Sequence, residues 1–301
     1  MTVLALDIGA TKFAAGVVRD GVEVHDVRRV DVPPSGVWEA CAGLLREVAA
    51  AAGDVSAVTA VGIGSAGPVD VRIGVINPLN IPEWKSGFAV VEAVAALFPT
   101  ATVRLAIDGA CLALAEFHVG ALRGVANALA MTVSSGIGGG IIEDGRVVVG
   151  RTGNAGHIGH IVVPGWDVPC ACGGVGCVEA VASGMSSVRW ARSQGWTGDT
   201  GVQLAAAANE GDEIAVAALH RSGTALGQAI ASASALLDID TVVIGGGFAE
   251  SGALLWDPLR AAVREHAGLQ YLRELRVLPS RVTHGATLVG AAALARSEDL
   301  V

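Results

Sequence analysis

A near-repeat of one strand–turn–strand pattern constrains the fold more than any other feature of the sequence. The segment LALDIGATKFAAGVVRDG begins at Leu4, and LAMTVSSGIGGGIIEDG begins at Leu129. Each copy reads as an apolar strand, a turn of small residues, a second strand and an Asp-Gly hairpin. Because strand–turn–strand patterns are common, chance similarity is the alternative. A true repeat predicts two related lobes that face each other.

The length and composition agree with an α/β protein. At 301 residues the chain exceeds the usual size of one domain, so two lobes or one large α/β domain are both open. Apolar residues make up 52% of the chain, and 41 glycines are spread along it rather than clustered. This composition is typical of a globular, turn-rich α/β fold.

Charge and hydropathy exclude several classes of partner. Apolar runs fall short of the ~20 residues that cross a bilayer, so we expect no membrane partner. The opening MTVLALDIG lacks a basic leader, which indicates a cytoplasmic location. A formal net charge of -9 disfavours nucleic acid, which needs a concentrated positive surface.

The hydrophobic pattern predicts strands and helices in alternation. Predicted strands cover 3–7, 13–18, 22–32, 57–64, 71–76 and 102–107, and a second cycle of strands starts at Ala128 and includes 241–246. Predicted helices cover 37–52, 88–97, 110–122, 183–195, 201–237, 252–267 and 286–296. Since chain termini often lie close together, we expect the last helix to pack on the first lobe.

Three glycine-rich turns, DIGATK (7–12), SSGIGGG (134–140) and GGGFAESG (245–252), each follow an apolar strand. Small residues there let backbone N–H groups approach phosphate oxygens. The first two turns lead into strands, which excludes the dinucleotide fingerprint and the Walker loop. For any single turn, an ordinary tight turn is the alternative.

The side chains of these turns extend the same prediction. Hydroxyls and one ammonium group would donate to the β- and γ-phosphates of a nucleotide, and Asp7 would hold a hydrated Mg²⁺. The predicted phosphate-binding residues are Asp7, Gly9, Ala10, Thr11, Lys12, Ser134, Ser135, Gly136, Gly246 and Gly247.

A second constellation lies in the segment HIVVPGWDVPCACGGVGC, which contains His160, Cys170, Cys172 and Cys177. Three thiolates and one imidazole suit tetrahedral Zn²⁺, and four protein ligands leave no position for water, so the predicted zinc is structural. Three free thiols in a glycine-rich loop are the alternative, although thiols so close together invite oxidation. The remaining cysteines, Cys41 and Cys111, read as core residues.

With both constellations in place, the chain resembles the ROK family of bacterial sugar kinases and repressors over nearly its full length. The motifs that carry the resemblance are LALDIGATKFAAGVV, VGIGSAGPVD, NIPEW, LAEFHVGALRG and AGHIGH followed by CACGGVGCVEAVASG. The resemblance implies an actin-like ATPase (ribonuclease H-like) fold with an ATP/sugar cleft between two lobes, ATP with Mg²⁺, and structural zinc. We expect a smaller lobe from 1–107 plus about 286–301. The larger lobe, 108–285, would hold the zinc loop and the adenosine-binding region.

The resemblance also implies the catalytic residue. Asp108 stands where ROK kinases keep the aspartate that accepts the proton of a sugar 6-hydroxyl as it attacks the γ-phosphorus in line. Taken alone, an aspartate before a helix is more often an N-cap. By the same resemblance, the sugar contacts Gly67, Asn80, Asp108, His157, His160 and Glu179.

Three positions depart from the glucokinase version of the pattern. Ile107 and Ala110 replace two asparagines around Asp108, and His157 replaces a glutamate. The His variant resembles N-acetylmannosamine kinases, which makes an amino or acylamino sugar the first choice of substrate. Kanosamine, a 3-amino-glucose, and plain glucose remain alternatives.

Functions of another class are also open. A repressor would need a helix-turn-helix domain ahead of the first strand at Val3, so we expect none here. A sugar sensor that does not phosphorylate is harder to exclude because of Ile107 and Ala110, and a non-sugar actin-like ATPase is a third possibility. By analogy with the family, we expect a homo-oligomer, either a dimer or a tetramer.

Overall fold

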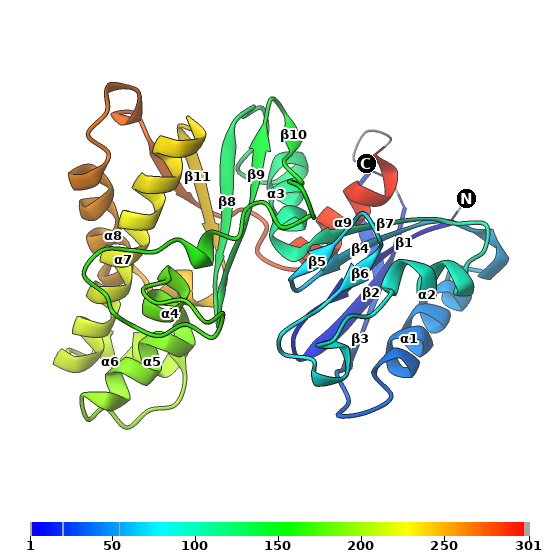
Figure 1. Ribbon diagram of the computed structural model, residues 1–301, viewed down its shortest axis with the longest axis horizontal. Coiled ribbons are helices and arrows are strands. Elements are labelled where there is room, and N and C mark those ends of the chain that lie inside the picture. The colour runs from blue at the N-terminus through cyan, green and yellow to red at the C-terminus, as the bar shows by residue number, and fades with distance from the viewer. Residues whose placement is uncertain (1, 20, 54, 298–301) are drawn as a thin grey trace. The chain divides into compact units, whose positions relative to one another are not determined.

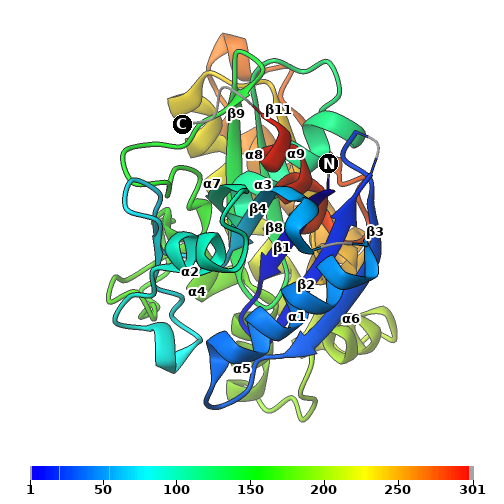
Figure 2. The same cartoon turned by 90° about the vertical axis from the view of Figure 1, so that its right-hand side faces the viewer.

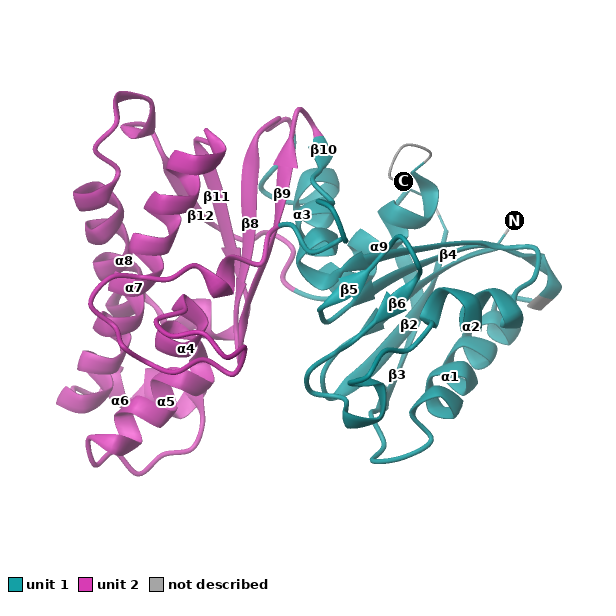
Figure 3. Cartoon of the chain, in the orientation of Figure 1, with its two compact units in different colours: residues 1–123, 146–155, 284–301 teal, residues 124–145, 156–283 magenta. Residues whose placement is uncertain are grey.

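The computed structural model describes residues 2–19, 21–53 and 55–297. Met1 and 298–301, at the two ends of the expected smaller lobe, lie outside the described residues, as does Asp20 of the first predicted Asp-Gly hairpin. The chain divides into two compact units, one formed by 1–123, 146–155 and 284–301 and the other by 124–145 and 156–283 (Figure 3).

The first unit is built on a five-stranded sheet with the order β3-β2-β1-β4-β7 (Figure 1). β1 runs antiparallel to β2, which runs antiparallel to β3, whereas β4 and β7 run parallel to β1. The strands are β1 (Thr2–Ile8), β2 (Lys12–Val18), β3 (Val24–Asp31), β4 (Val58–Ser65) and β7 (Thr102–Ile107).

Helices cover both faces of this sheet. α1 (Val37–Ala51) packs on β2 and β3, and Figure 2 shows it lying across them. α3 (Asp108–Val119) and α9 (Ala286–Arg296) pack together, and α9 also contacts β1, β4 and β7. Gly62 and Gly290 permit this packing, because a Cβ on either would collide with backbone atoms of the neighbouring helix. The prediction that the last helix returns to the first lobe is therefore confirmed.

The remaining elements of the first unit are short. They are η1 (Val55–Ala57), β5 (Val69–Asp70), β6 (Val75–Ile76), η2 (Pro82–Trp84), α2 (Val90–Leu97) and β10 (Arg146–Val147). The predicted strand at 71–76 was wrong: β5 and β6 form a hairpin whose connection occupies most of that range. Its turn is fixed by Gly74, at φ 68°, and by a 2.6 Å ion pair between Asp70 and Arg72.

The second unit is built on a sheet in which its strands follow the order β9-β8-β11-β12. β9 is antiparallel to β8, whereas β11 is parallel to both β8 and β12. The strands are β8 (Ala128–Val133), β9 (Ile137–Glu143), β11 (Thr241–Gly245) and β12 (Arg276–Pro279). The helices are η3 (Ile158–His160), α4 (Val178–Ala182), α5 (Gly184–Ser193), α6 (Gly201–Asn209), α7 (Glu213–Leu237), η4 (Gly247–Ser251), α8 (Ala253–His266) and η5 (Gln270–Leu272).

The two sheets share one topology. β2-β1-β4-β7 and β9-β8-β11-β12 match in order and in direction, strand by strand. The agreement extends to strands outside the two similar sequence segments. The repeat is therefore reflected in the fold and is not a chance similarity of two hairpins.

Two other expectations differ from the structure. The expected boundary at residue 107 separated α3 from the first lobe, but α3 belongs to the first unit because it packs against α9. The helical range expected at 201–237 is divided into two helices, since Gly211 has φ 92° and Asp212 caps α7 by accepting from the Ala215 N–H at 2.8 Å. Among the described residues, no helix combines the length and apolar character that membrane crossing requires.

Candidate functional site

In the first unit, the carboxyl ends of three parallel strands gather several predicted site residues. Across the ladder Ile8 of β1 lies opposite Ser65 of β4, which lies opposite Ile107 of β7. The segments that follow these strands therefore emerge at the same edge, which is where open α/β sheets bind ligands. This register brings the DIGATK turn, the Ser65–Gly67 segment and Asp108 to one edge of the sheet.

Asp108 is the first residue of α3 and is half-buried. Its Oδ1 accepts a hydrogen bond from the Gly109 N–H at 2.7 Å. The positive end of the helix macrodipole favours an ionised carboxylate at this position. The neighbouring Ile107 and Ala110 are only 3% and 4% exposed, so both pack into the core and present no polar group.

Asp7 lies close enough to Asp108 for the two charges to interact. The pKa of Asp7 is raised from 3.8 to about 7, mainly by burial and in addition by the nearby Asp108, whereas Arg29 opposes both effects. The thiol of Cys111 is buried between α3 and β4, and burial together with these two carboxylates raises its pKa well above the usual value. The edge of this sheet therefore concentrates negative charge in a partly enclosed place, which suits a cation.

The DIGATK turn exposes its polar groups. The Gly9 N–H donates to the Lys12 carbonyl at 3.1 Å, which closes the turn, and both Thr11 and Lys12 are exposed. Ala10 is half-buried, and the Lys12 Nζ lies 4.0 Å from Asp31. Gly67 is half-buried at the shared strand edge, whereas Asn80 is exposed in the loop between β6 and η2.

In the second unit, His160, Cys170, Cys172 and Cys177 converge. Their ligand atoms all lie within 4.8 Å of one another. The Sγ atoms of Cys172 and Cys177 are 3.7 Å apart, and the Cys170 Sγ is 3.9 Å from the His160 Nδ1. A tetrahedron with Zn–S bonds of about 2.3 Å has edges of about 3.8 Å, so the donor set and its spacing fit zinc.

Glu179, in the first turn of α4, links this cluster to the second glycine turn. Its Oε2 accepts from the Ile137 N–H at 2.8 Å. A Cβ on Gly136 would lie 2.8 Å from the same oxygen, so any other residue there would shift the Glu179 carboxylate.

His157 stands next to the cluster, with its ring 5.6 Å from that of His160. Burial lowers the pKa of His157, the charge of His160 lowers it further, and Glu179 opposes this. His157 is therefore neutral at pH 7 and has one donor and one acceptor nitrogen. Because His160 directs Nδ1 to the cysteines, its Nε2 is the nitrogen available to a ligand.

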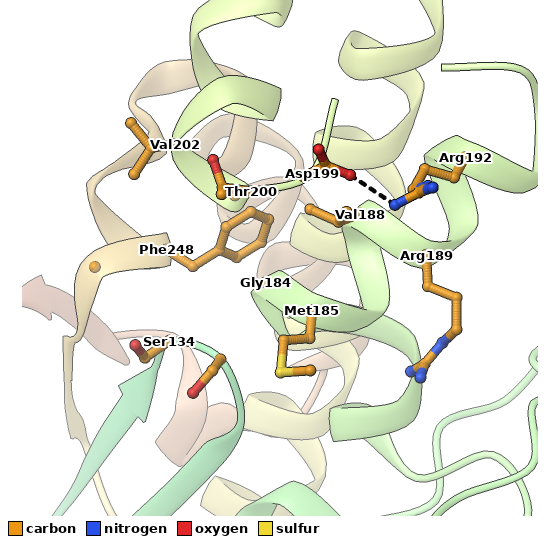
Figure 4. A pocket seen from close by; sticks show the side chains of 13 residues that line it. Ser134, Gly184, Met185, Val188, Arg189, Arg192, Asp199, Thr200, Val202 and Phe248 are labelled. Atoms are coloured by element: carbon orange, nitrogen blue, oxygen red, sulfur yellow. Dashed lines mark hydrogen bonds and ion pairs between the residues drawn. The ribbon is translucent and has the colours of Figure 1, made fainter. Parts of the chain in front are cut away.

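A pocket of about 630 Å³ opens beside the ends of β8 and β11 (Figure 4). It brings together Ser134 and Ser135 of the second glycine turn and Gly247 of the third, whereas Gly136 and Gly246 do not line it. The other lining residues are Gly184, Met185, Val188, Arg189, Arg192, Asp199, Thr200, Gly201, Val202 and Phe248.

The lining combines an apolar wall with charged groups. Figure 4 shows the Phe248 ring between Thr200 and Met185, and Arg189 and Arg192 on the α5 side. Arg192 is paired with Asp199 at 2.7 Å, whereas Arg189 forms no ion pair within the described residues and donates to the Ser186 Oγ. Such a pocket suits a ligand with a flat apolar ring and an anionic tail.

Sequence reasoning missed the residues that line this pocket on the α5 side and at Phe248. A signal was present, because Arg189 and Arg192 recur three residues apart after Gly184, and this spacing places both on one helix face. Phe248 lies within the third glycine-rich turn but reads as an ordinary core residue.

Gly246 and Gly247 have different roles despite being neighbours. Gly246 has φ 97°, and a Cβ there would lie 2.6 Å from the Val133 carbonyl oxygen. Gly247 has no atom within 4 Å of such a Cβ and faces the pocket. The first glycine is required by packing against β8, and the second leaves space for a ligand.

Comparisons with known proteins agree with this geometry. The model of the ROK family matches residues 3–298. An N-acetylmannosamine kinase from Escherichia coli (strain SMS-3-5 / SECEC) is 34% identical, with 100% of both chains covered. The crystal structure of a ROK hexokinase from Thermus thermophilus is 35% identical with a TM-score of 0.84, covering 98% of each chain. A ROK glucokinase from Streptomyces griseus, solved with glucose and AMPPNP, is 30% identical with a TM-score of 0.82, covering 98% of this chain and 99% of its own.

These likenesses confirm the expected mixed α/β, actin-like ATPase fold. The relatives that match over the full length are named as kinases, which supports an enzyme of this class. The chain belongs to the ROK family.

Proposed function

We propose that this chain transfers the γ-phosphoryl group of ATP to the 6-hydroxyl of a hexose, and that N-acetylmannosamine is the preferred sugar. The observation that carries the proposal is the position of Asp108, whose carboxylate lies at the carboxyl edge of β1, β4 and β7, within interaction range of Asp7. Full-length likeness to an N-acetylmannosamine kinase supports the choice of sugar.

In the proposed reaction, Asp108 acts as the general base. Its carboxylate accepts the proton of the sugar 6-hydroxyl while the hydroxyl oxygen bonds to the γ-phosphorus and the bond to the β,γ-bridging oxygen breaks. The hydrogen bond from Gly109 orients this carboxylate, and the helix N-terminus favours negative charge at this place. ADP leaves with the former bridging oxygen.

The nucleotide is proposed to occupy the pocket beside β8 and β11. The adenine ring would lie against Phe248 and Val188, and the phosphates would point toward the Ser134–Ser135 turn, whose backbone and hydroxyl groups donate. The glucokinase from Streptomyces griseus was solved with AMPPNP, which supports ATP as the donor. Gly9 to Lys12 would contribute further donors from the DIGATK turn.

Two metals belong to the proposal. Mg²⁺ would supply neutralisation of phosphate charge, and Asp7 would hold it through water, which relieves the repulsion between Asp7 and Asp108. Zn²⁺ would have a structural role at His160 and the three cysteines, fixing the loop that carries the sugar-binding side chains.

The sugar preference is attributed to His157. A neutral imidazole offers one donor and one acceptor, whereas a carboxylate at the same place could only accept. An acylamino group has both an N–H and a C=O, so it is the matching substituent. Glu179 and the Nε2 of His160 would bind neighbouring ring hydroxyls, and Gly67 and Asn80 are proposed sugar contacts from the first unit.

Coupled-enzyme kinetics with five sugars tests the proposal. We expect the highest kcat/KM for N-acetylmannosamine, followed by kanosamine, N-acetylglucosamine, glucose and mannose. A clear preference for glucose would overturn the assigned sugar and leave the kinase intact. Absence of ATP turnover with every sugar would instead favour the non-catalytic sensor, for which the apolar Ile107 and Ala110 are the specific observation.

Two finer expectations accompany this proposal. A cytoplasmic location is proposed because ATP and phosphorylated sugars are retained there, and a homo-oligomer is proposed by analogy with the family. Light scattering coupled to size-exclusion chromatography would test the second expectation, and a monomer at micromolar concentration would contradict it.

A further inference from the structure

A cationic side chain lies buried in the second unit without a carboxylate partner. Arg221 of α7 is 8% exposed, and within the described part of the chain it forms no ion pair. Among the residues that the structure describes, its hydrogen bond goes from Nη1 to the carbonyl of Val181 in α4. Arginine is seldom buried unless it is paired, so other groups must stabilise the charge of this guanidinium.

Two indole rings flank this guanidinium. The Cζ of Arg221 lies 4.9 Å from the ring centroid of Trp166 and 5.5 Å from that of Trp190. Cation–π contacts of this kind stabilise the charge and hold the group in place. The Nε1 of Trp166 donates to Gln228 at 3.3 Å, which fixes one of the two rings. The guanidinium carbon lies over the faces of both rings, and the N–H groups of a guanidinium point outward in its own plane.

The same residues line a pocket of about 650 Å³. The pocket has mainly apolar walls from Trp166, Trp190, Val216 and Ala217, and it is completed by Gly211, Glu213, His220, Arg221 and Thr224. The volume lies within the range of small-molecule sites. Of the buried side-chain nitrogen and oxygen atoms that the structure describes, only the Ser234 Oγ lacks a partner, so the remaining nitrogens of Arg221 are not sealed from the pocket.

This pocket is separate from the proposed nucleotide pocket, since the two share no lining residue. α5 separates them: Val188 and Arg189 face the nucleotide pocket, whereas Trp190 faces the other. Neither the zinc ligands nor the proposed sugar residues line it.

We propose that this pocket binds a small monocarboxylate with a flat apolar body. The planar carboxylate would accept hydrogen bonds from Arg221, and the apolar body would lie against Trp166 and Trp190. Glu213 at the same pocket disfavours phosphate esters and other multiply charged anions. Trp166 belongs to the loop between His160 and Cys170, and Arg221 bonds to α4, the helix that carries Glu179, so a ligand would contact two residues that support the proposed sugar site. Binding itself does not rest on the proposed function.

A purely structural role for Arg221 is the competing explanation. Its bond to Val181 places a cation in the last turn of α4, where the helix dipole favours one. A structural role predicts that replacing Arg221 lowers the melting temperature and that the wild-type protein binds no carboxylate here.

Isothermal titration calorimetry of the full chain with phenylacetate tests the proposal. We expect a Kd in the millimolar range or tighter, and at least tenfold weaker binding of phenylacetamide, which has the same shape without the charge. Arg221→Gln should weaken phenylacetate binding at least tenfold.

A second variant tests the proposal without changing Arg221, in case Arg221→Gln does not fold. Ala217 is exposed on α7 one turn before Arg221, so Ala217→Phe obstructs the pocket and leaves the guanidinium in place. We expect it to abolish binding, whereas Ala206→Phe, at an exposed site on α6 outside the pocket, should bind as the wild type does. Absence of binding to the wild type, or equal binding to wild type and Ala217→Phe, would overturn the proposal.

Discussion

The carboxyl ends of the two sheets show what one topology can do with different residues. Asp7 of β1 lies opposite Gly64 of β4, and Thr132 of β8 lies opposite Gly245 of β11, so Asp7 and Thr132 occupy equivalent places in the repeat. The first edge has two interacting carboxylates, because Asp108 lies beside Asp7. The second edge has hydroxyls, glycines and a pocket in which Arg189 forms no ion pair with any residue that the structure describes.

This difference indicates a division of work between the units. An acidic edge suits proton removal and a divalent cation, whereas an edge of hydroxyls and backbone N–H groups suits phosphate. In both units the strands form the shared framework, and the residues just past the strand ends provide the groups that would contact ligands. Five substitutions, with two control variants, test this division.

Removing the base from the acidic edge should have the largest effect. Asp108→Asn keeps the shape of the side chain but cannot accept the proton, so we expect kcat to fall by about 10²–10⁴-fold. The KM for ATP should change little, because the proposed nucleotide pocket belongs to the other unit. Steady-state kinetics with the best sugar measures both.

Asp257→Asn is the matched control for this change, since Asp257 is an exposed carboxylate on α8. It should leave kcat within twofold of the wild type. Near-normal turnover of Asp108→Asn would remove Asp108 from the mechanism.

Removing one zinc ligand should affect the second unit alone. Cys172→Ser leaves three donors in a site that fits four, so we expect loss of stoichiometric zinc and a rise of about 10-fold or more in the sugar KM. Metal analysis by mass spectrometry gives the first readout. Cys41→Ala, which changes a buried cysteine of α1, should retain one zinc per chain; zinc retained by Cys172→Ser would contradict the proposed site.

The two glycines of the third turn should differ in their sensitivity to alanine. Gly246→Ala brings a Cβ to 2.6 Å from the Val133 carbonyl oxygen at a positive φ, so we expect a loss of about 1–3 kcal/mol of stability. Gly247→Ala meets no atom within 4 Å and should change stability by less than about 0.5 kcal/mol. Urea unfolding of both variants measures the contrast, and equal losses would refute it.

The smallest effect concerns the stability of the acidic edge. The folded pKa of Asp7, about 7, lies above its ordinary value of 3.8, so the protonated carboxyl stabilises the fold below about pH 4 and this contribution is lost as pH rises through 7. Asp7→Asn should therefore be more stable than the wild type at pH 8. We expect a gain in the free energy of unfolding of only about 1–2 kcal/mol, because the side chain is partly exposed and water screens its charge.

Thermal or urea unfolding without nucleotide and Mg²⁺ measures this gain, which should vanish at pH 4. The same variant should lose kinase activity. If Asp7→Asn is less stable than the wild type at pH 8, the ionised Asp7 carboxylate does not destabilise the fold.

Much of the fold could be predicted because apolar periodicity and turn residues are local. β7 was predicted at its observed bounds, and the repeat led to the shared topology of the two sheets. The four residues of the Cys/His cluster were picked out because soft donors at short spacing are rare in a sequence. β12 and α4 were missed, since each is short and depends on packing against the rest of its unit.

The lining of the nucleotide-sized pocket could not be predicted for a different reason. Met185, Arg189 and Phe248 come from separate segments and meet only when α5 packs near the ends of β8 and β11. The exposure of Gly247 and the close contact of Gly246 likewise depend on where β8 passes. Glycine in a sequence shows that space is needed but not whether backbone or ligand fills it.

The most direct test of the account is the identity of the product. Incubation with ATP, Mg²⁺ and N-acetylmannosamine, followed by two-dimensional ¹H–³¹P NMR, shows which oxygen has received the phosphoryl group. The account predicts a correlation between phosphorus and the C6 protons with the wild-type protein, and none with Asp108→Asn. Phosphate at another hydroxyl, or ADP and free phosphate without a sugar phosphate, would contradict it.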